Sequence, residues 1–265
     1  MGYDTISNPV MTTLYSRYNN GMNTIERIRN ALLPRAAHDE IADITIGRIY
    51  AAVTLKSGNL GLAHFEGGHG ANRTQPQPAP GDPGGLEEVL SRLGGTDPYV
   101  SAIGCAAAAA LAAAKTDIFP EGDVLDRLAV LPGDRVVMVG GFPIESDLRK
   151  RGADLLVYDR SRGIGDMGKL PKSLNDADLV VITATAIINN TIDEILERIH
   201  HARETVILGP STILVPEAFR DTPVTGLFGI VPRDAATIRD IIADGGGTRD
   251  FIRHAKKVEA AVPTG

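Results

Sequence analysis

The chain has 265 residues, of which 43% are apolar, and it carries a formal net charge of −6. An acidic chain is not expected to neutralise a phosphate backbone, so nucleic acid is excluded as a partner. The single cysteine, Cys105, excludes an internal disulfide and a cysteine-rich metal site. The length favours two domains over one.

No segment predicts export or membrane insertion. Residues 1–23 are polar and lack the apolar core of a secretory signal. The longest stretch of low polarity, residues 100–114, is too short and too rich in alanine to cross a bilayer. We therefore expect a cytoplasmic protein with no membrane partner.

The first half predicts helices around a small antiparallel sheet. Apolar residues at helical spacing predict a helix over residues 22–33, which Pro34 should end. Strands are expected at 41–46, 49–56 and 60–65, and Ser57-Gly58-Asn59 is typical of a hairpin turn between the last two. Residues 67–85 predict a surface loop.

Two more helices complete this half. They are expected at residues 86–93 and 99–115, and the second is rich in alanine and follows Asp97-Pro98. A connector with Pro120, Gly122, Pro132 and Gly133 then predicts a domain boundary near 120. The two predicted domains are an α+β unit at 1–120 and a ligand-binding unit at 121–265.

The second half predicts a doubly wound α/β fold. Short apolar runs, most of them separated by helix-like segments, are typical of buried parallel strands with crossover helices. The runs lie at residues 136–139, 155–158, 179–183, 206–208 and 224–230. Because an open parallel sheet binds ligands at the carboxyl ends of its strands, the residues after each run are the candidate site.

Two candidate groups follow the first two runs. Gly140 and Gly141 permit a sharp turn and a close ligand approach, or they form only a tight turn from strand to helix. Asp159 lies nineteen residues after Gly140, the spacing at which a dinucleotide site places an acid on a ribose hydroxyl. The alternative for Asp159 is an Asx turn at the end of its strand.

The third and fourth runs are followed by hydroxyl and amide groups. Thr185 and Asn189 lie in the segment 183–191, where Asn190 or Thr191 is expected to cap a helix over 192–200. Gly209, Ser211 and Thr212 form a turn with Pro210 that suits a carboxylate or phosphate, or serves as a capped turn.

Histidines offer a weaker metal hypothesis. In an extended segment His64 and Glu66 share a face, and His69 follows. Imidazole and carboxylate suit a divalent transition metal, so His64 and Glu66 are candidate ligands. At the C-terminus, Gly245-Gly246-Gly247 either ends a helix or forms a flap, and the charged tail 249–259 predicts a solvated helix.

Several of these motifs together resemble those of a known family. They are the run from Val181 to Thr191, then Leu208-Gly209-Pro210-Ser211-Thr212, Asp244-Gly245-Gly246-Gly247-Thr248 and Lys256-Lys257-Val258. Gly61-Leu62-Ala63 and the small-residue helix around Cys105 agree. From about residue 22 to 258 the chain resembles the putative heavy-metal chelation family. That resemblance implies an enolase N-terminal-like domain, a Rossmann-like domain, and a site in the cleft between them.

The leading hypothesis is therefore binding of a small anionic or metal-bearing ligand in an interdomain cleft. The groups that would line it are Gly140, Gly141, Asp159, Thr185, Asn189, Gly209, Ser211 and Thr212. The alternative is an enzyme that uses a nucleoside cofactor of the NAD or S-adenosylmethionine type, with Asp159 on its ribose. A homodimer is the expected assembly, because most soluble oligomers are symmetric pairs of one chain.

Overall fold

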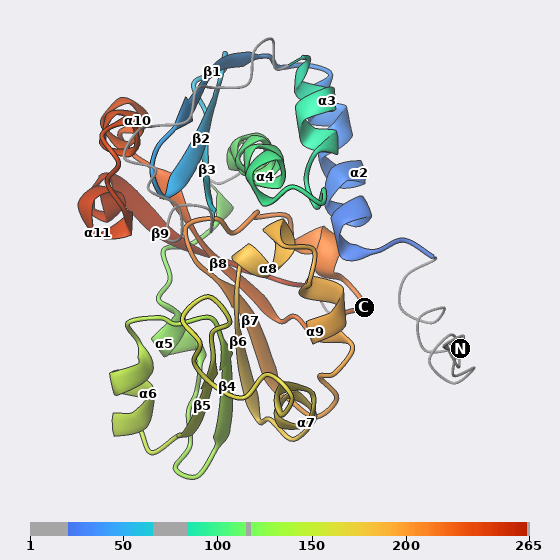
Figure 1. The fold of residues 1–265 in the computed structure, drawn as a ribbon, viewed down its shortest axis with the longest axis vertical. Helices are drawn as coiled ribbons and strands as arrows, with labels where there is room; N and C mark the ends of the chain where they lie inside the picture. The colour runs from blue at the N-terminus through green and yellow to red at the C-terminus, as the bar shows by residue number, and fades with distance from the viewer. Residues whose placement is uncertain (1–20, 66–83, 115–117, 264–265) are drawn as a thin grey trace, which may run out of the picture.

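The computed structural model describes residues 21–65, 84–114 and 118–263, which form two sheets with helices around them (Figure 1). Labels follow Figure 1. The N-terminal sheet is antiparallel in the order β1-β2-β3, with the expected hairpin between β2 and β3. Its strands are β1 (Ile41–Ile46), β2 (Tyr50–Leu55) and β3 (Leu60–His64).

Helix α2 (Thr24–Ala36) begins at a capping box, in which Asn23 and Glu26 bond each other's backbone N–H. The expectation that Pro34 ends this helix is wrong, because the helix continues to Ala36. Leu32 and Ala36 are both buried in the core. That burial outweighs the one backbone hydrogen bond that the proline cannot donate near the helix end.

Helix α3 (Leu86–Ser91) precedes the alanine-rich helix α4 (Pro98–Ala113), which starts where the sequence predicts. The Asp97 side chain accepts a hydrogen bond from the Tyr99 N–H at 2.9 Å and caps the helix. Strand β3 runs directly against α4: a Cβ at Gly61 would overlap the backbone of Ala106 and Ala110. Small residues on both elements therefore allow this close backbone contact.

The larger sheet has the order β5-β4-β6-β7-β8-β9, and its first five strands are parallel. This confirms the predicted Rossmann-like α/β fold. The strands are β4 (Arg135–Val139), β5 (Asp154–Tyr158), β6 (Leu179–Thr183), β7 (Glu204–Leu208), β8 (Gly226–Pro232) and β9 (Ala255–Ala261).

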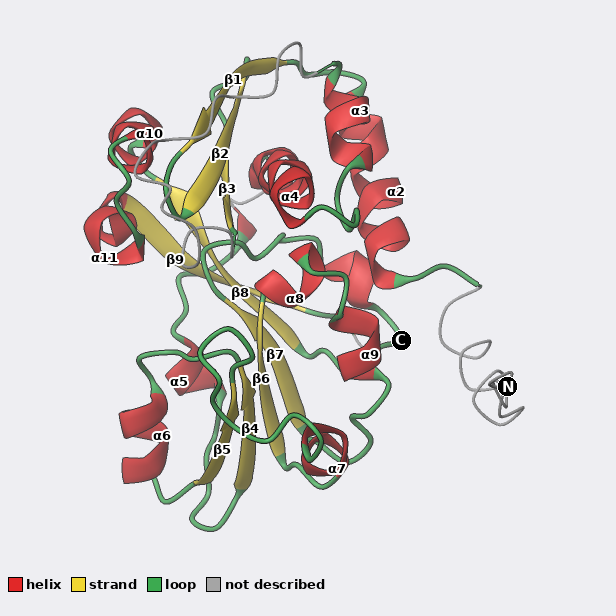
Figure 2. Ribbon diagram, viewed as in Figure 1, coloured by secondary structure: helices red, strands yellow, loops and turns green. Residues whose placement is uncertain are grey.

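Helices cover both faces of this sheet (Figure 2). Leu148 of α6 packs on one face, and Leu174 of α7 and Ile195 of α9 pack on the other. The connecting elements are α5 (Val124–Arg127), α6 (Glu145–Lys150), α7 (Leu170–Asn175), α8 (Thr185–Ile188), α9 (Ile192–Leu196) and the 3₁₀ helix η2 (Pro216–Phe219). Thr191 stands at the expected cap of α9, but its hydroxyl donates to the Ala186 carbonyl instead of capping the helix.

The C-terminal segment differs from the prediction. Residues 249–259 are not one solvated helix: α11 (Thr248–Phe251) and the turn η3 (Ile252–His254) lead into β9, which pairs antiparallel with β8. Charged residues alternate there with Val258 and Ala260, which are buried, so the period is that of a strand with one covered face. Gly245, with φ +82°, ends the preceding helix α10 (Ala235–Ala243).

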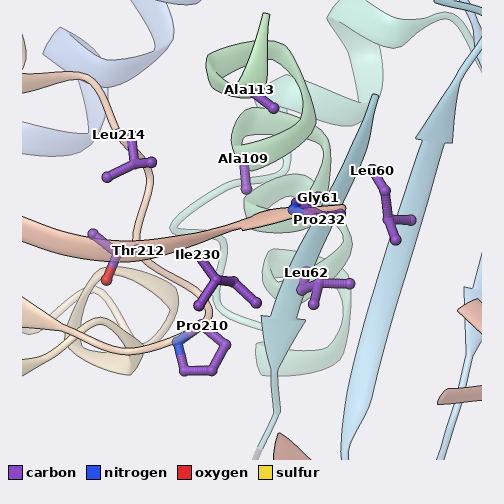
Figure 3. Close-up of a pocket in the computed structure, with 10 residues that line it drawn as sticks. All are labelled: Leu60, Gly61, Leu62, Ala109, Ala113, Pro210, Thr212, Leu214, Ile230 and Pro232. Atoms are coloured by element: carbon purple, nitrogen blue, oxygen red, sulfur yellow. The ribbon is translucent and has the colours of Figure 1, made fainter. Parts of the chain in front are cut away.

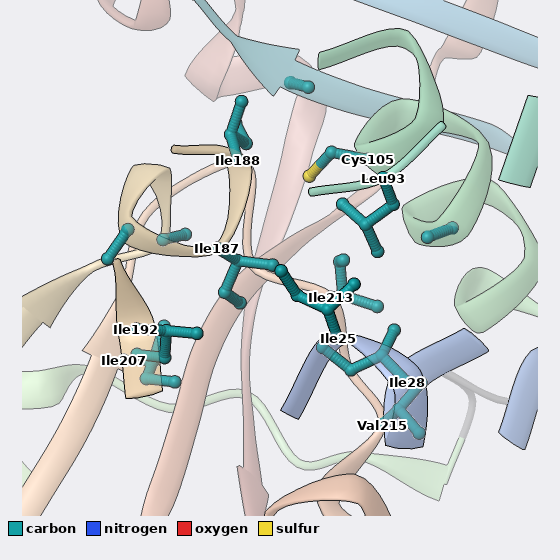
Figure 4. Packing of buried hydrophobic residues seen from close by; sticks show 14 of the residues in the cluster. Ile25, Ile28, Leu93, Cys105, Ile187, Ile188, Ile192, Ile207, Ile213 and Val215 are labelled. Atoms are coloured by element: carbon teal, nitrogen blue, oxygen red, sulfur yellow. The ribbon is translucent and has the colours of Figure 1, made fainter. Parts of the chain in front are cut away.

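The two halves of the chain are packed together. Helices α10 and α11 lie against the N-terminal sheet, where Ile242 and Phe251 are buried with Tyr50 and Leu62. On the other face of that sheet one continuous core joins α2 and α4 to α8 and the segment after β7 (Figure 4). The boundary near residue 120 stays a prediction. Among the described residues, no helix combines the length and apolar character needed to cross a membrane.

Candidate functional site

The carboxyl ends of the parallel strands point toward the N-terminal sheet (Figure 1). Strand β4 is the first of the sheet in sequence, yet β5 lies on one side of it and β6 on the other. The chain therefore changes winding direction between β4 and β6, and open α/β sheets bind ligands at such a point. Every residue that the sequence singles out as a candidate for ligand binding follows β4, β5, β6 or β7.

We use the name glycine edge for six residues at this point: Gly140, Gly141, Asp159, Arg162, Thr183 and Thr185. Gly140 has φ +96°, and a Cβ there would lie 2.7 Å from Cβ of Thr183, so only glycine fits. The hydroxyls of Thr183 and Thr185 lie 3.0 Å apart, and both side chains are half-buried. Two neutral hydroxyls, one of which donates to the other, thus lie beside the turn formed by Gly140 and Gly141.

Asp159 is nearly buried and already holds several donors. One oxygen accepts from the Gly141 N–H at 3.0 Å, and the other accepts from the Ser161 hydroxyl at 2.7 Å and the Arg162 N–H at 3.1 Å. Burial alone would raise the pKa of this carboxyl, but these hydrogen bonds and the Arg162 charge together lower it below its ordinary value. Asp159 therefore stays ionised and ties the turn after β5 to the turn after β4.

Arg162 extends over Gly141. Its Nη1 would lie 2.6 Å from a Cβ placed on Gly141, and its Nε lies 3.6 Å from the Asp159 carboxylate. The Arg162 side chain is 63% exposed, whereas that of Asp159 is 10% exposed. Arg162 is therefore the partner in this ion pair that faces solvent.

The turn after β7, residues 209–212, is built from similar residue types but has different surroundings; we call it the β7 turn. Ser211 and Thr212 are 2% and 3% exposed. The Ser211 hydroxyl accepts the backbone N–H of His64 at 2.8 Å, and the Thr212 hydroxyl donates to the Phe228 carbonyl at 2.9 Å. Gly209 is half-buried, with the Phe142 ring 3.9 Å from its Cβ position.

The junction beside the β7 turn is closely packed. A cavity of about 10 Å³ lies between β3, α4 and β8, and Pro210 and Thr212 contribute to its wall (Figure 3). It has room for one water molecule at most. Asn189 lies apart from this junction, exposed at the end of α8. The structure thus groups Gly140, Gly141, Asp159 and Thr185, buries Ser211 and Thr212 under the N-terminal half, and leaves Asn189 on the surface.

The described donors do not fit a heavy-metal centre. His64 is half-buried at the end of β3, its ring edge-on to Tyr50 at 5.4 Å, and Glu66 and His69 lie outside the described residues. Burial raises the pKa of the Cys105 thiol to about 12, so this side chain offers no thiolate. Within the described ranges, no three His, Cys, Asp or Glu side chains gather where they could hold a metal ion.

Thr183, Arg162 and Phe142 belong to this region but are missing from the list of candidates drawn from the sequence. The signal for Arg162 was a basic residue three positions after a strand-terminal acid, in Asp159-Arg160-Ser161-Arg162-Gly163. An Asx turn brings the third residue back toward the carboxylate, which places this arginine beside the glycines. Phe142 occupies a position that looked like part of a tight turn, and only the structure shows its ring beside Gly209.

Comparison with known families agrees with the fold. The chain belongs to the DUF364 family, described as Putative heavy-metal chelation, whose sequence pattern matches residues 123–261. A second pattern with the same description, DUF4213, matches residues 29–112. Residues 113–122 lie between the two matches.

Two solved structures share this architecture. A DUF364 protein of unknown function from Pyrococcus horikoshii matches with a TM-score of 0.78 at 22% identity, over 91% of this chain and 100% of that one. Another, from Desulfitobacterium hafniense, matches with a TM-score of 0.72 at 20% identity, over 96% and 100%. An uncharacterised Methanocaldococcus jannaschii protein is 26% identical over 149 residues, which span 53% of this chain and 58% of that protein.

Proposed function

We propose that this protein binds a small anionic ligand at the glycine edge, on the side of the larger sheet that faces the N-terminal half. A metal ion would enter as part of an anionic complex and not through protein ligands. The observation that carries this proposal is the grouping of Gly140, Gly141, Thr183 and Thr185 at the point where the sheet changes winding direction.

The chemistry of the donors supports an anion. Hydroxyl groups and an exposed guanidinium stabilise carboxylate or phosphate oxygens, whereas heavy metals prefer thiolate and imidazole. The family description concerns heavy metals, and an anionic metal complex is the form in which a metal would suit these groups. Cytoplasmic location and a homodimer remain predictions that accompany this proposal.

The state of Asp159 favours an anion over a nucleoside cofactor. A ribose hydroxyl needs a carboxylate with accepting capacity toward the ligand. The two oxygens of Asp159 already accept from Gly141, Ser161 and Arg162, and the side chain is nearly buried. The glycine edge therefore offers a cation and hydroxyls to a ligand rather than an acid.

Thermal unfolding with a panel of compounds tests this proposal. The panel is inorganic phosphate, citrate, Ni²⁺ alone, Ni²⁺ with citrate, NAD and S-adenosylmethionine. A ligand at one hundred times its Kd adds about 2.7 kcal/mol to the free energy of unfolding, a rise of several degrees in the midpoint. We expect phosphate or citrate to raise the midpoint and Thr185→Ala to reduce that rise. The proposal would be overturned if Ni²⁺ alone raised the midpoint. It would also be overturned if neither phosphate nor citrate raised it.

A further inference from the structure

The glycine edge holds one charged side chain that is mostly exposed to solvent, that of Arg162. The Arg162 guanidinium lies on an exposed turn, and its one described ion pair is the 3.6 Å contact from Nε to Asp159. A guanidinium carries five N–H donors, and this contact involves only the one on Nε. The remaining donors are the strongest available at this place for a planar oxyanion.

Two features of the turn position this guanidinium. The Asp159 carboxylate receives the backbone N–H of Arg162 at 3.1 Å and so fixes the start of the side chain. Gly141 then leaves the space that Nη1 occupies, since a Cβ there would lie 2.6 Å from this atom. Asp159, which shapes the turn, is therefore buried, whereas the Arg162 guanidinium that it positions is exposed.

We propose that Arg162 is the residue that recognises the ligand, through hydrogen bonds from its guanidinium to a carboxylate or phosphate group, and that Asp159 and Gly141 are positioning residues for it. This inference rests on the proposed function and names its ligand class: a small molecule with an oxyanion held over Gly141. The Thr183 and Thr185 hydroxyls, at the strand next to Gly140, would receive the rest of the same ligand.

Calorimetric titration of the full chain with inorganic phosphate and with citrate tests this role. Arg162→Gln should weaken the binding of whichever anion the wild type binds by tenfold or more, and Arg162→Lys should restore part of it, because lysine keeps the charge without the fork of donors. The matched control is Arg160→Gln, two residues away on the same exposed turn, which should change the Kd by less than twofold.

Gly141→Ala provides a second variant that keeps every charge. Its added methyl group should push the flexible end of Arg162 aside and weaken anion binding severalfold, while the midpoint of the ligand-free protein stays near that of the wild type. An anion-induced rise in the midpoint that is lost in Arg162→Gln, with the ligand-free midpoint unchanged, separates recognition from a structural role.

The outcomes distinguish the role of Arg162 from the proposed function on which it rests. If the wild type binds neither phosphate nor citrate, the proposed function fails and this inference fails with it. If the wild type binds an anion and Arg162→Gln binds it equally well, only the role of Arg162 is overturned. Equal losses in Arg160→Gln and Arg162→Gln would also overturn it, since they would indicate a general effect of charge.

Discussion

The glycine edge and the β7 turn lie at the same edge of one sheet and contain similar residues, yet their surroundings differ. At the β7 turn the hydroxyls of Ser211 and Thr212 are buried and bonded to the backbone of β3 and β8. At the glycine edge the hydroxyls pair with each other, and the charged group of Arg162 faces solvent. A glycine and hydroxyl turn after a parallel strand can therefore be buried between two parts of a protein or stay partly open to solvent.

The largest effect should come from filling the packed junction. Gly61→Ala would drive a methyl group into the backbone of α4, where neither Ala106 nor Ala110 can move as a flexible side chain could. We expect a loss of more than about 3 kcal/mol in the free energy of unfolding, measured by urea denaturation. Gly163→Ala is the control: its φ is +65° but its surroundings are open, so about 1 kcal/mol is expected. If Gly61→Ala and Gly163→Ala lost similar amounts of unfolding free energy, the proposed difference between the packed junction and the exposed turn would be contradicted.

Removing the Ser211 hydroxyl should have the next largest effect. Ser211→Ala would deprive the His64 backbone N–H of its acceptor in a closely packed junction, at a cost of about 1–3 kcal/mol. Thr185→Ala, at the half-buried glycine edge, should cost less than about 1 kcal/mol. Anion affinity should fall more in Thr185→Ala than in Ser211→Ala. A stability loss for Thr185→Ala as large as that for Ser211→Ala would break the distinction between the two places.

The lowered pKa of Asp159 predicts a dependence of stability on pH. Because its folded pKa lies below the unfolded value of about 3.9, Asp159 contributes fully at higher pH, and the contribution is lost as pH falls through the folded pKa. Asp159→Asn should thus be destabilised relative to wild type by about 1–2 kcal/mol at pH 7. The difference should shrink below about pH 4. Urea denaturation across pH 3–7 would refute this if the difference stayed constant or grew on acidification.

The smallest effect on stability should come from Arg162 itself. In its ion pair with Asp159, the arginine side chain is mostly exposed to solvent, and such pairs contribute little to the free energy of unfolding. Arg162→Gln should therefore change the free energy of unfolding by no more than about 0.5 kcal/mol. A loss above about 1 kcal/mol would mean that this arginine holds the turn together, and that the glycine edge is structural like the β7 turn.

The sequence predicted the fold well because apolar periodicity decides it. The five parallel strands, the hairpin before β3 and the alanine-rich helix α4 were all expected from local patterns of the kind that burial imposes. The errors lie where local signals compete with packing. Pro34 should end a helix, yet burial of Ala36 extends it, and the charges of Lys256, Lys257 and Glu259 hid the alternation of an edge strand.

The candidate site was harder to predict, since spacing identifies which residues follow a strand but not what covers them. Ser211 and Thr185 looked equivalent, and only the packing of β3 against the β7 turn separates them. The position of Arg162 over Gly141 depends on two turns that are close in space and about twenty residues apart in sequence. The Asx turn indicates that Arg162 returns toward Asp159, but no local pattern places that turn beside Gly141.

Backbone amide chemical shifts during titration with phosphate or citrate test the central claim most directly. Binding at the glycine edge predicts that the amides of Gly140, Gly141, Arg162 and Thr185 shift together with one Kd, while those of Ser211 and Thr212 remain unchanged. Shifts confined to the β7 turn, or saturable binding that leaves Gly141 and Arg162 unaffected, would contradict this account.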